Sequence, residues 1–184
     1  MKKLLLIPML VISISTLGQS LSKAWKTDLS NSLSQFKTCT TGANSEGCHK
    51  FSGESVQKVY GVNDFFSKEM QRYMLIDEIY DYLVNSSHWE LLGKGYEQDA
   101  LSKGQQYAND GRAVVAVKKE KTNDYGHMAI ILPGELGASG SWGLRVPNAA
   151  SFFTHQISKS FINQKLSYAF TPRDQGYVLI YARK

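Results

Sequence analysis

The stretch GCHKFSGESVQKVY, residues 47–60, is the strongest indicator of how the first half of the chain folds. Its apolar residues Phe51, Val56 and Tyr60 recur at helical spacing, and a loop with glycine and asparagine precedes it. This pattern predicts a helix that ends at about Tyr60, just before a glycine. Cys48 then lies at the N-terminus of the helix, where the helix dipole favours the thiolate form of cysteine.

Further helices are expected on both sides of this stretch. The segment 22–36 has an amphipathic pattern, and the apolar stripe from Phe66 to Leu83 predicts a long helix capped by Asn63 or Asp64. A shorter helix is predicted over 97–107, where it ends before an Asn-Asp-Gly turn.

The second half of the chain changes to short apolar runs separated by turn residues, which are typical of strands. The predicted strands are 112–118, 126–132, 141–146, 166–170 and 177–182. Helices followed by strands predict an α+β fold, with N-terminal helices packed on an antiparallel β-sheet. The length of 184 residues suits one domain, expected over 22–184.

Residues 1–18 have the pattern of a secretory signal peptide. Lys2 and Lys3 form a basic region, the apolar segment 4–17 follows, and small or polar residues come next. The apolar segment is too short and wrongly flanked for a stable membrane span. We therefore expect cleavage between residues 18 and 24 and a secreted or periplasmic protein that leaves the membrane.

The charge of the chain excludes few functions. Loss of residues 1–18 lowers the formal net charge from +5 to +3, because two lysines and no acidic residues are removed. The basic residues are scattered, which argues against a nucleic-acid partner and suits ordinary solubility or an anionic cell wall. The sequence has no His-Glu-x-x-His, no Cys-x-x-Cys and no phosphate loop, so no metal or cofactor is expected.

A cysteine nucleophile needs a base, and the sequence offers four histidines for that role. His49 adjoins Cys48, but neighbours on a helix point in different directions. His88 follows a predicted helix end beside Trp89 and is expected at the surface, and His155 lies in a polar segment. His127 opens the apolar run of a predicted strand and is the preferred base, although a structural or surface role is the alternative.

The order of these features resembles the papain-like peptidoglycan hydrolases, which include NlpC-type cysteine peptidases, CHAP amidases and the amidase effectors of type VI secretion. The resemblance covers roughly residues 44–132 and, more loosely, the later strands. Its carriers are the loop-cysteine-helix stretch 44–56, the helix end at 100–104, the strand 113–117 and the strand start 126–131. The Asp-Cys-Ser-Gly-Phe form common in NlpC proteins is replaced by Gly47-Cys48-His49-Lys50-Phe51.

This resemblance implies an exported cysteine hydrolase, either an endopeptidase or an amidase, that cleaves amide bonds of peptidoglycan peptides. It places Cys48 as the nucleophile and His127 as the base. An antibacterial toxin with the same chemistry is a further possibility, and it would have an immunity protein as its partner.

The remaining site residues are predicted from the expected hairpin after His127. The hairpin would return Asn148 to the imidazole, so that its side chain orients the ring. A simple turn role for Asn148 is the alternative, as are other polar residues near the tip of the hairpin (Glu135, Ser139 and Ser141). The Cys48 backbone N–H, with Asn44 or Gln35, is expected to bind the oxyanion.

The two cysteines leave a different function open. In an exported protein, Cys39 and Cys48 can form a disulfide that closes a short polar loop. The protein would then be a secreted, disulfide-stapled binding domain without catalysis. Free thiols would favour the enzyme, and bonded cysteines would favour the binding domain.

Overall fold

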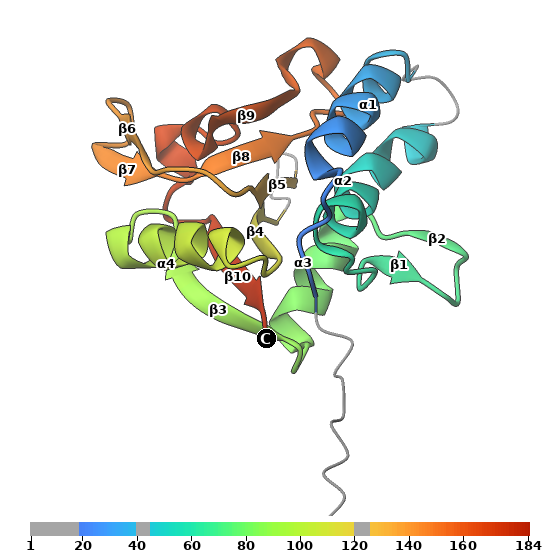
Figure 1. The fold of residues 1–184 in the computed structure, drawn as a ribbon, viewed down its shortest axis with the longest axis horizontal. Helices are drawn as coiled ribbons and strands as arrows, with labels where there is room; N and C mark the ends of the chain where they lie inside the picture. Colours follow the sequence, from blue (N-terminus) through green and yellow to red (C-terminus); the bar gives the residue numbers. More distant parts are fainter. Residues whose placement is uncertain (1–18, 40–44, 120–125) are drawn as a thin grey trace, which may run out of the picture.

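The computed structural model describes residues 19–39, 45–119 and 126–184. This part of the chain has an α+β architecture in which helices cover both faces of a six-stranded antiparallel sheet (Figure 1). The strand order is β3-β10-β4-β5-β8-β9, and every neighbouring pair is antiparallel. The predicted α+β class with an antiparallel sheet is therefore confirmed.

The sheet strands come mainly from the second half of the chain, as the apolar runs predict. They are β3 (Trp89–Lys94), β4 (Val114–Lys118), β5 (His127–Ile131), β8 (Asn148–Ser151), β9 (Phe161–Lys165) and β10 (Leu179–Arg183). All five residues of β4 are buried because the sheet is covered on both faces at its centre. A separate hairpin is formed by β6 (Gly137–Ser139) and β7 (Leu144–Val146).

The helices divide between the two faces of the sheet. They are α1 (Trp25–Lys37), α2 (Ser45–Tyr60), α3 (Ile76–Asn85) and α4 (Gln98–Asn109). Figure 1 shows α4 on one side of the sheet and the other three helices on the opposite side. Side-chain contacts support this division. On one face, a Cβ on Gly104 of α4 would lie 3.4 Å from Cδ1 of Ile131 in β5. On the other face, Phe152 stacks on Phe51 of α2 with ring centroids 6.1 Å apart.

The helix predicted from residues 47–60 is confirmed and is α2. It ends where Gly61 takes a φ of +68°, a left-handed conformation that glycine adopts without steric cost. The buried Tyr60 hydroxyl donates a hydrogen bond to the carbonyl of Ile131 at 2.5 Å. This bond ties the end of α2 to the end of β5. Helices are also found where 22–36 and 97–107 predict them.

The long helix predicted through Phe66 and Leu83 is wrong over its first half. The chain forms a small hairpin there, with β1 (Phe66–Ser67) paired to β2 (Arg72–Tyr73), and only α3 is helical. Gln71 has a positive φ of 53°, which a helix cannot include. Met70, counted in the apolar stripe, is 56% exposed, so the periodicity did not reflect burial.

A second error concerns the C-terminal strands. The segment predicted as a strand over 166–170 is a short 3-10 helix, η2 (Leu166–Tyr168), and the neighbouring strand is β9. β8 was not predicted, because its residues Asn-Ala-Ala-Ser lack the branched and aromatic side chains that signal a strand. Two further 3-10 turns are η1 (Ile157–Lys159) and η3 (Pro172–Asp174).

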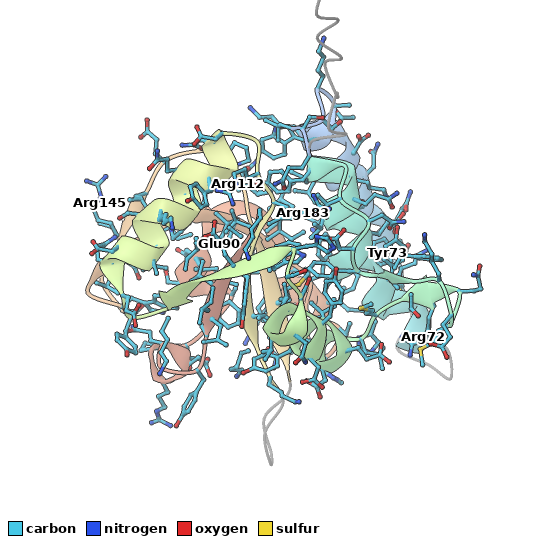
Figure 2. The ribbon with its side chains drawn as sticks, turned by 90° about the horizontal axis from the view of Figure 1, so that it is seen from below. Arg72, Tyr73, Glu90, Arg112, Arg145 and Arg183 are labelled. Carbon is cyan, nitrogen blue, oxygen red and sulfur yellow. A yellow bond between two sulfur atoms is a disulfide. The ribbon has the colours of Figure 1, made fainter. Side chains whose placement is uncertain are left out.

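Ion pairs fasten the β3 edge of the sheet to its neighbours. The Arg112 guanidinium bonds Glu90 of β3 at 2.8 Å, and Arg183 of β10 bonds the Asp64 carboxylate at 2.8 Å. Figure 2 shows Glu90, Arg112 and Arg183 close together in this region. Among the residues that the structure describes, no helix combines the length and apolar character needed to cross a bilayer.

Candidate functional site

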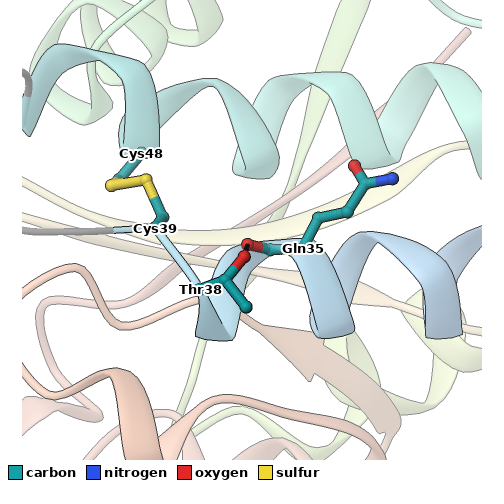
Figure 3. Close-up of a disulfide and its surroundings, with 4 residues drawn as sticks. All are labelled: Gln35, Thr38, Cys39 and Cys48. Carbon is teal, nitrogen blue, oxygen red and sulfur yellow. Dashed lines mark hydrogen bonds between the residues drawn. A yellow bond between two sulfur atoms is a disulfide. The ribbon is translucent and has the colours of Figure 1, made fainter.

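The sulfur of Cys48 is bonded to Cys39. Cys39 lies just after α1 and Cys48 lies in the first turn of α2, with their Cα atoms 5.9 Å apart (Figure 3). Cys48 is 2% exposed, whereas Cys39 is only partly buried. In this state the chain has no Cys48 thiol for a base to deprotonate.

His127 lies at the start of β5 and is held by a serine on the next strand. Its Nε2 is 2.6 Å from Oγ of Ser151, which is 1% exposed. Two aromatic rings enclose the imidazole, with Phe153 stacked at 4.2 Å between centroids and Phe170 edge-on at 5.4 Å. The hydrogen-bonding contact with Ser151 and the packing of Phe153 and Phe170 therefore restrict the orientation of the ring.

A cavity of about 340 Å³ lies at this end of the sheet. Four segments line it, and it is where α2 and the start of β5 meet. Its lining residues are His49 and Ser52 of α2, residues 75–78 at the start of α3, Gly126 and His127, and Phe152, Thr154 and His155 after β8. Ser52 is one helical turn beyond Cys48 on the same face of α2, so the turn that carries Cys48 borders this cavity.

The imidazole of His127 and the sulfur of Cys48 do not face each other. Side chains alternate along a strand, so His127 shares its face of the sheet with Ile131, which packs under α4. Cys48 belongs to α2, on the opposite face. The structure thus brings the helix and the strand of the predicted pair to one cavity, but it does not assemble a thiol–imidazole pair.

Asn148 is not beside His127, so the predicted position of the third residue is wrong. Its carbonyl accepts a hydrogen bond from the Leu132 N–H, and its side chain donates to the Pro133 carbonyl at 3.0 Å, both at the opposite end of β5. The reason is that β6 and β7 form their own hairpin rather than extending β5, and the partner of β5 is β8. In that register Ser151, three residues after Asn148, is the residue that reaches the imidazole.

The other candidates are spread over the molecule. His88 is exposed at the start of β3, His155 is exposed at the cavity, and Ser139 and Ser141 contact each other in the separate hairpin. The Gln35 side chain is directed away from the disulfide in Figure 3. Asn44, the predicted oxyanion-binding residue, lies outside the described residues.

Charged groups lie at the start of α3, which lines the cavity, and beside His127 on β4. At the start of α3, two hydrogen bonds of 2.8 Å from Arg72 hold the pKa of Glu78 below its ordinary value. On β4, Lys118 is the cross-strand partner of His127, and its ammonium group bonds Asp174 at 2.9 Å. Burial raises the pKa of Asp174, but hydrogen bonds from Lys118 and Thr171 outweigh it and leave this pKa below the usual value.

The part of the chain with described coordinates holds no cluster of three or more histidine, cysteine or acidic residues arranged to bind a metal ion. The site residue that sequence reasoning missed is Ser151. A lone serine in an Ala-Ala-Ser-Phe-Phe run carries no catalytic signature, and only the pairing of β8 with β5 reveals its contact.

Comparison with known proteins does not extend these findings. No protein-family model matches the chain. No curated protein matches it either.

Proposed function

We propose that the reduced form of this protein is an exported cysteine hydrolase that cleaves amide bonds in peptidoglycan peptides. The observation that carries the proposal is the shared cavity, lined by the α2 turn of Cys48 and by the start of β5, where His127 lies in contact with Ser151. The resemblance of residues 44–132 to papain-like peptidoglycan hydrolases supplies the substrate class. The third residue in this proposal is Ser151 and no longer Asn148.

The proposed chemistry begins with opening of the disulfide by a dithiol reductant. Its thiolate attacks the more accessible sulfur, that of Cys39, and the S–S bond breaks with Cys48 leaving as the thiolate. The second thiol of the reductant then attacks the mixed disulfide and releases Cys39. The protein gains two thiols, and the reductant becomes a cyclic disulfide.

The reduced Cys48 then acts as the nucleophile, once its thiol comes within hydrogen-bond distance of His127. His127 takes the thiol proton, and the thiolate attacks the amide carbonyl carbon. The C–N bond breaks as the imidazolium returns the proton to the leaving amine. Water, activated by the same imidazole, cleaves the thioester and restores the thiol. Backbone N–H groups of the first turn of α2, with Asn44, are proposed to bind the oxyanion.

A second candidate is favoured by the disulfide itself and by the orientation of His127 away from α2. In this case the protein is a secreted, disulfide-stapled domain that binds a cell-wall or host-surface ligand at the same cavity and performs no catalysis. The disulfide would then be permanent and purely structural.

The two candidates are separated by digesting purified peptidoglycan with and without a dithiol reductant. New amino groups and new reducing sugar ends are measured in parallel, so that amide and glycosidic cleavage are distinguished. The hydrolase predicts amine release only with the reductant and none from Cys48→Ala or His127→Ala. Amine release from both variants would contradict the mechanism, and retention on peptidoglycan without any cleavage would favour the binding domain.

A further inference from the structure

Two open depressions lie on either side of the loop 133–136, which follows β5. One has a volume of about 600 Å³ and lies between this loop and α4, and the other has a volume of about 450 Å³ and lies between the loop and β9. Gly134 and Glu135 line both depressions, so the two adjoin across the loop. Figure 2 shows Arg145, which lines the first depression, on the opposite side of the molecule from Arg72, whose partner Glu78 lines the cavity. The depressions are therefore remote from the cavity.

Amide side chains are the main polar groups of both depressions. They come from α4 (Gln98, Gln105, Gln106 and Asn109), from β8 (Asn148) and from β9 (Asn163 and Gln164). Each amide carries donors and an acceptor without a charge, so such a surface suits a neutral ligand rich in hydroxyl and amide groups.

The inner amides hold the backbone of the surface in place. The side chain of Asn109 donates to the Gly134 carbonyl at 3.0 Å and accepts from the Gly134 N–H at 2.8 Å. Gln98 makes the same two bonds with the backbone of Arg145, both at 2.9 Å. A surface that is fixed before binding loses less conformational entropy when a ligand binds.

The outer amides and the apolar lining suit a saccharide. Gln106 and Gln164 are exposed, and they lie one in each depression. Leu136 lines the first depression, and Pro133 and Pro147 line the second. A sugar ring presents apolar C–H faces between its hydroxyl groups, so it can use both kinds of lining at once.

The charges of the lining favour a neutral ligand over an acidic one. Arg145 and Lys165 donate to backbone carbonyl oxygens at 3.0 and 2.6 Å, and the Lys26 ammonium group lies over the ring of Trp25. These cations are thus already engaged within the chain, and Glu135 adds a negative charge to both depressions. An acidic peptide would meet a like charge there.

We propose that this amide-lined surface, made of the two depressions, binds the N-acetylated glycan strand of peptidoglycan. The saccharide class follows from the lining, and the choice of this glycan rests on the proposed function. The hydroxyl and N-acetyl groups of the strand exchange hydrogen bonds with Gln106 and Gln164, and its ring faces lie on the apolar residues. A bound strand keeps the protein on the cell wall and leaves the cavity open for a peptide.

The experiment is a titration of the intact, oxidised protein with chitohexaose, a soluble hexamer of N-acetylglucosamine. Calorimetry gives the Kd, and nitrogen-15 NMR follows the side-chain amide signals. Saturable binding that shifts the signals of Gln106 and Gln164 is expected. Cellohexaose has hydroxyl groups in place of the N-acetyl groups and should bind about tenfold more weakly, because the hydrogen bonds of the N-acetyl groups are lost.

Two variants test the surface residue by residue. Gln106→Ala and Gln164→Ala should each raise the Kd for chitohexaose by about threefold to tenfold, because each removes an exposed amide and leaves the bonds of the inner amides intact. The matched control is Asn31→Ala, which removes an exposed amide from α1 outside both depressions. It should leave the Kd unchanged.

The inference is overturned if millimolar chitohexaose shifts none of these signals, if cellohexaose binds equally well, or if both variants keep the native Kd. Shifts of the same signals by a peptidoglycan stem peptide and not by the glycan would overturn it as well. Failure of the proposed function is a different result, namely chitohexaose binding at this surface by a protein that releases no amine when reduced. Amine release without chitohexaose binding would refute only the present inference.

Discussion

Cys39 and Cys48 are joined by a disulfide that links the end of α1 to the first turn of α2, with Cα atoms 5.9 Å apart. The bond engages the sulfur of Cys48, which is the nucleophile that the sequence predicts. Its state therefore distinguishes a latent hydrolase from a stapled binding domain. The bond should also stabilise the folded protein, whichever of the two functions is correct.

Removing the disulfide with Cys39→Ser should lower the free energy of unfolding by about 3 kcal/mol, because a short loop no longer restricts the unfolded chain. Urea unfolding without a reductant measures the difference. Native protein unfolded with a dithiol reductant should approach the value of the variant. Equal stability of the native and variant proteins without a reductant would show that the cysteines are not bonded in solution.

The Lys118–Asp174 pair should make stability depend on acid pH. The Asp174 pKa is lowered in the folded protein, so its contribution is present above the unfolded pKa of about 4 and is lost as pH falls through the folded value. Asp174→Asn should remove this part of the pH dependence. At pH 7 it should cost about 3 kcal/mol, because the ion pair between Lys118 and Asp174 is lost in a site where the Lys118 side chain is 7% exposed.

Urea unfolding at pH 7 and at pH 3 measures both effects. The matched control is Asp81→Asn, whose partner Lys119 is on the surface, with side chains 59% and 44% exposed. Surface pairs contribute little, so this control should leave the stability unchanged. Identical acid profiles for Asp174→Asn and the native protein would contradict the assignment.

Gly53 should tolerate no side chain, because α2 lies directly against the β1–β2 hairpin there. A Cβ would stand 2.9 Å from Cδ1 of Tyr73 and 3.2 Å from the Phe65 Cβ. Gly53→Ala should therefore cost about 1–3 kcal/mol of stability despite the better helix propensity of alanine. Gly47→Ala, in the same helix with nothing within 4 Å of the added Cβ, should be neutral or stabilising. Thermal unfolding of both variants tests this, and equal effects would refute the packing argument.

Asn148→Ala should lower the free energy of unfolding and leave the rate of amide cleavage unchanged. Its side chain holds the Pro133 carbonyl and its backbone N–H donates to Gln105 of α4, so it connects three segments far from the imidazole. Loss of the side-chain bond should cost about 1 kcal/mol. Amine release per folded molecule should match the native protein, and a loss of amine release like that expected for His127→Ala would show that Asn148 belongs to the site.

The fold was best predicted where the apolar residues of a regular sequence pattern are also buried in the structure. The α2 stretch has both helical spacing and a terminating glycine, and β4 and β5 are unbroken apolar runs. The prediction of a helix over the β1–β2 hairpin is wrong because apolar residues at helical spacing are not always buried on one face, as the exposed Met70 shows. Strand β8 could not be predicted, because its small residues have little strand propensity and only the pairing with β5 defines it.

The candidate site was predictable only in part for the same reason. Cys48 and His127 have local signatures, a helix start and a strand start, and both belong to segments that border the cavity. Their relation to each other depends on strand alternation and on the disulfide, which are properties of the assembled fold. Ser151 contacts His127 across 24 residues of sequence, and no local pattern records that contact.

The most direct test of the central claim is amine release from peptidoglycan by Cys39→Ser in the absence of any reductant, with Cys48→Ser as its matched control. Both variants lack the disulfide, and only the first keeps the proposed nucleophile. The hydrolase predicts cleavage by Cys39→Ser at the rate of the reduced native protein and none by Cys48→Ser. No cleavage by folded Cys39→Ser, or equal cleavage by both variants, would contradict a Cys48 nucleophile.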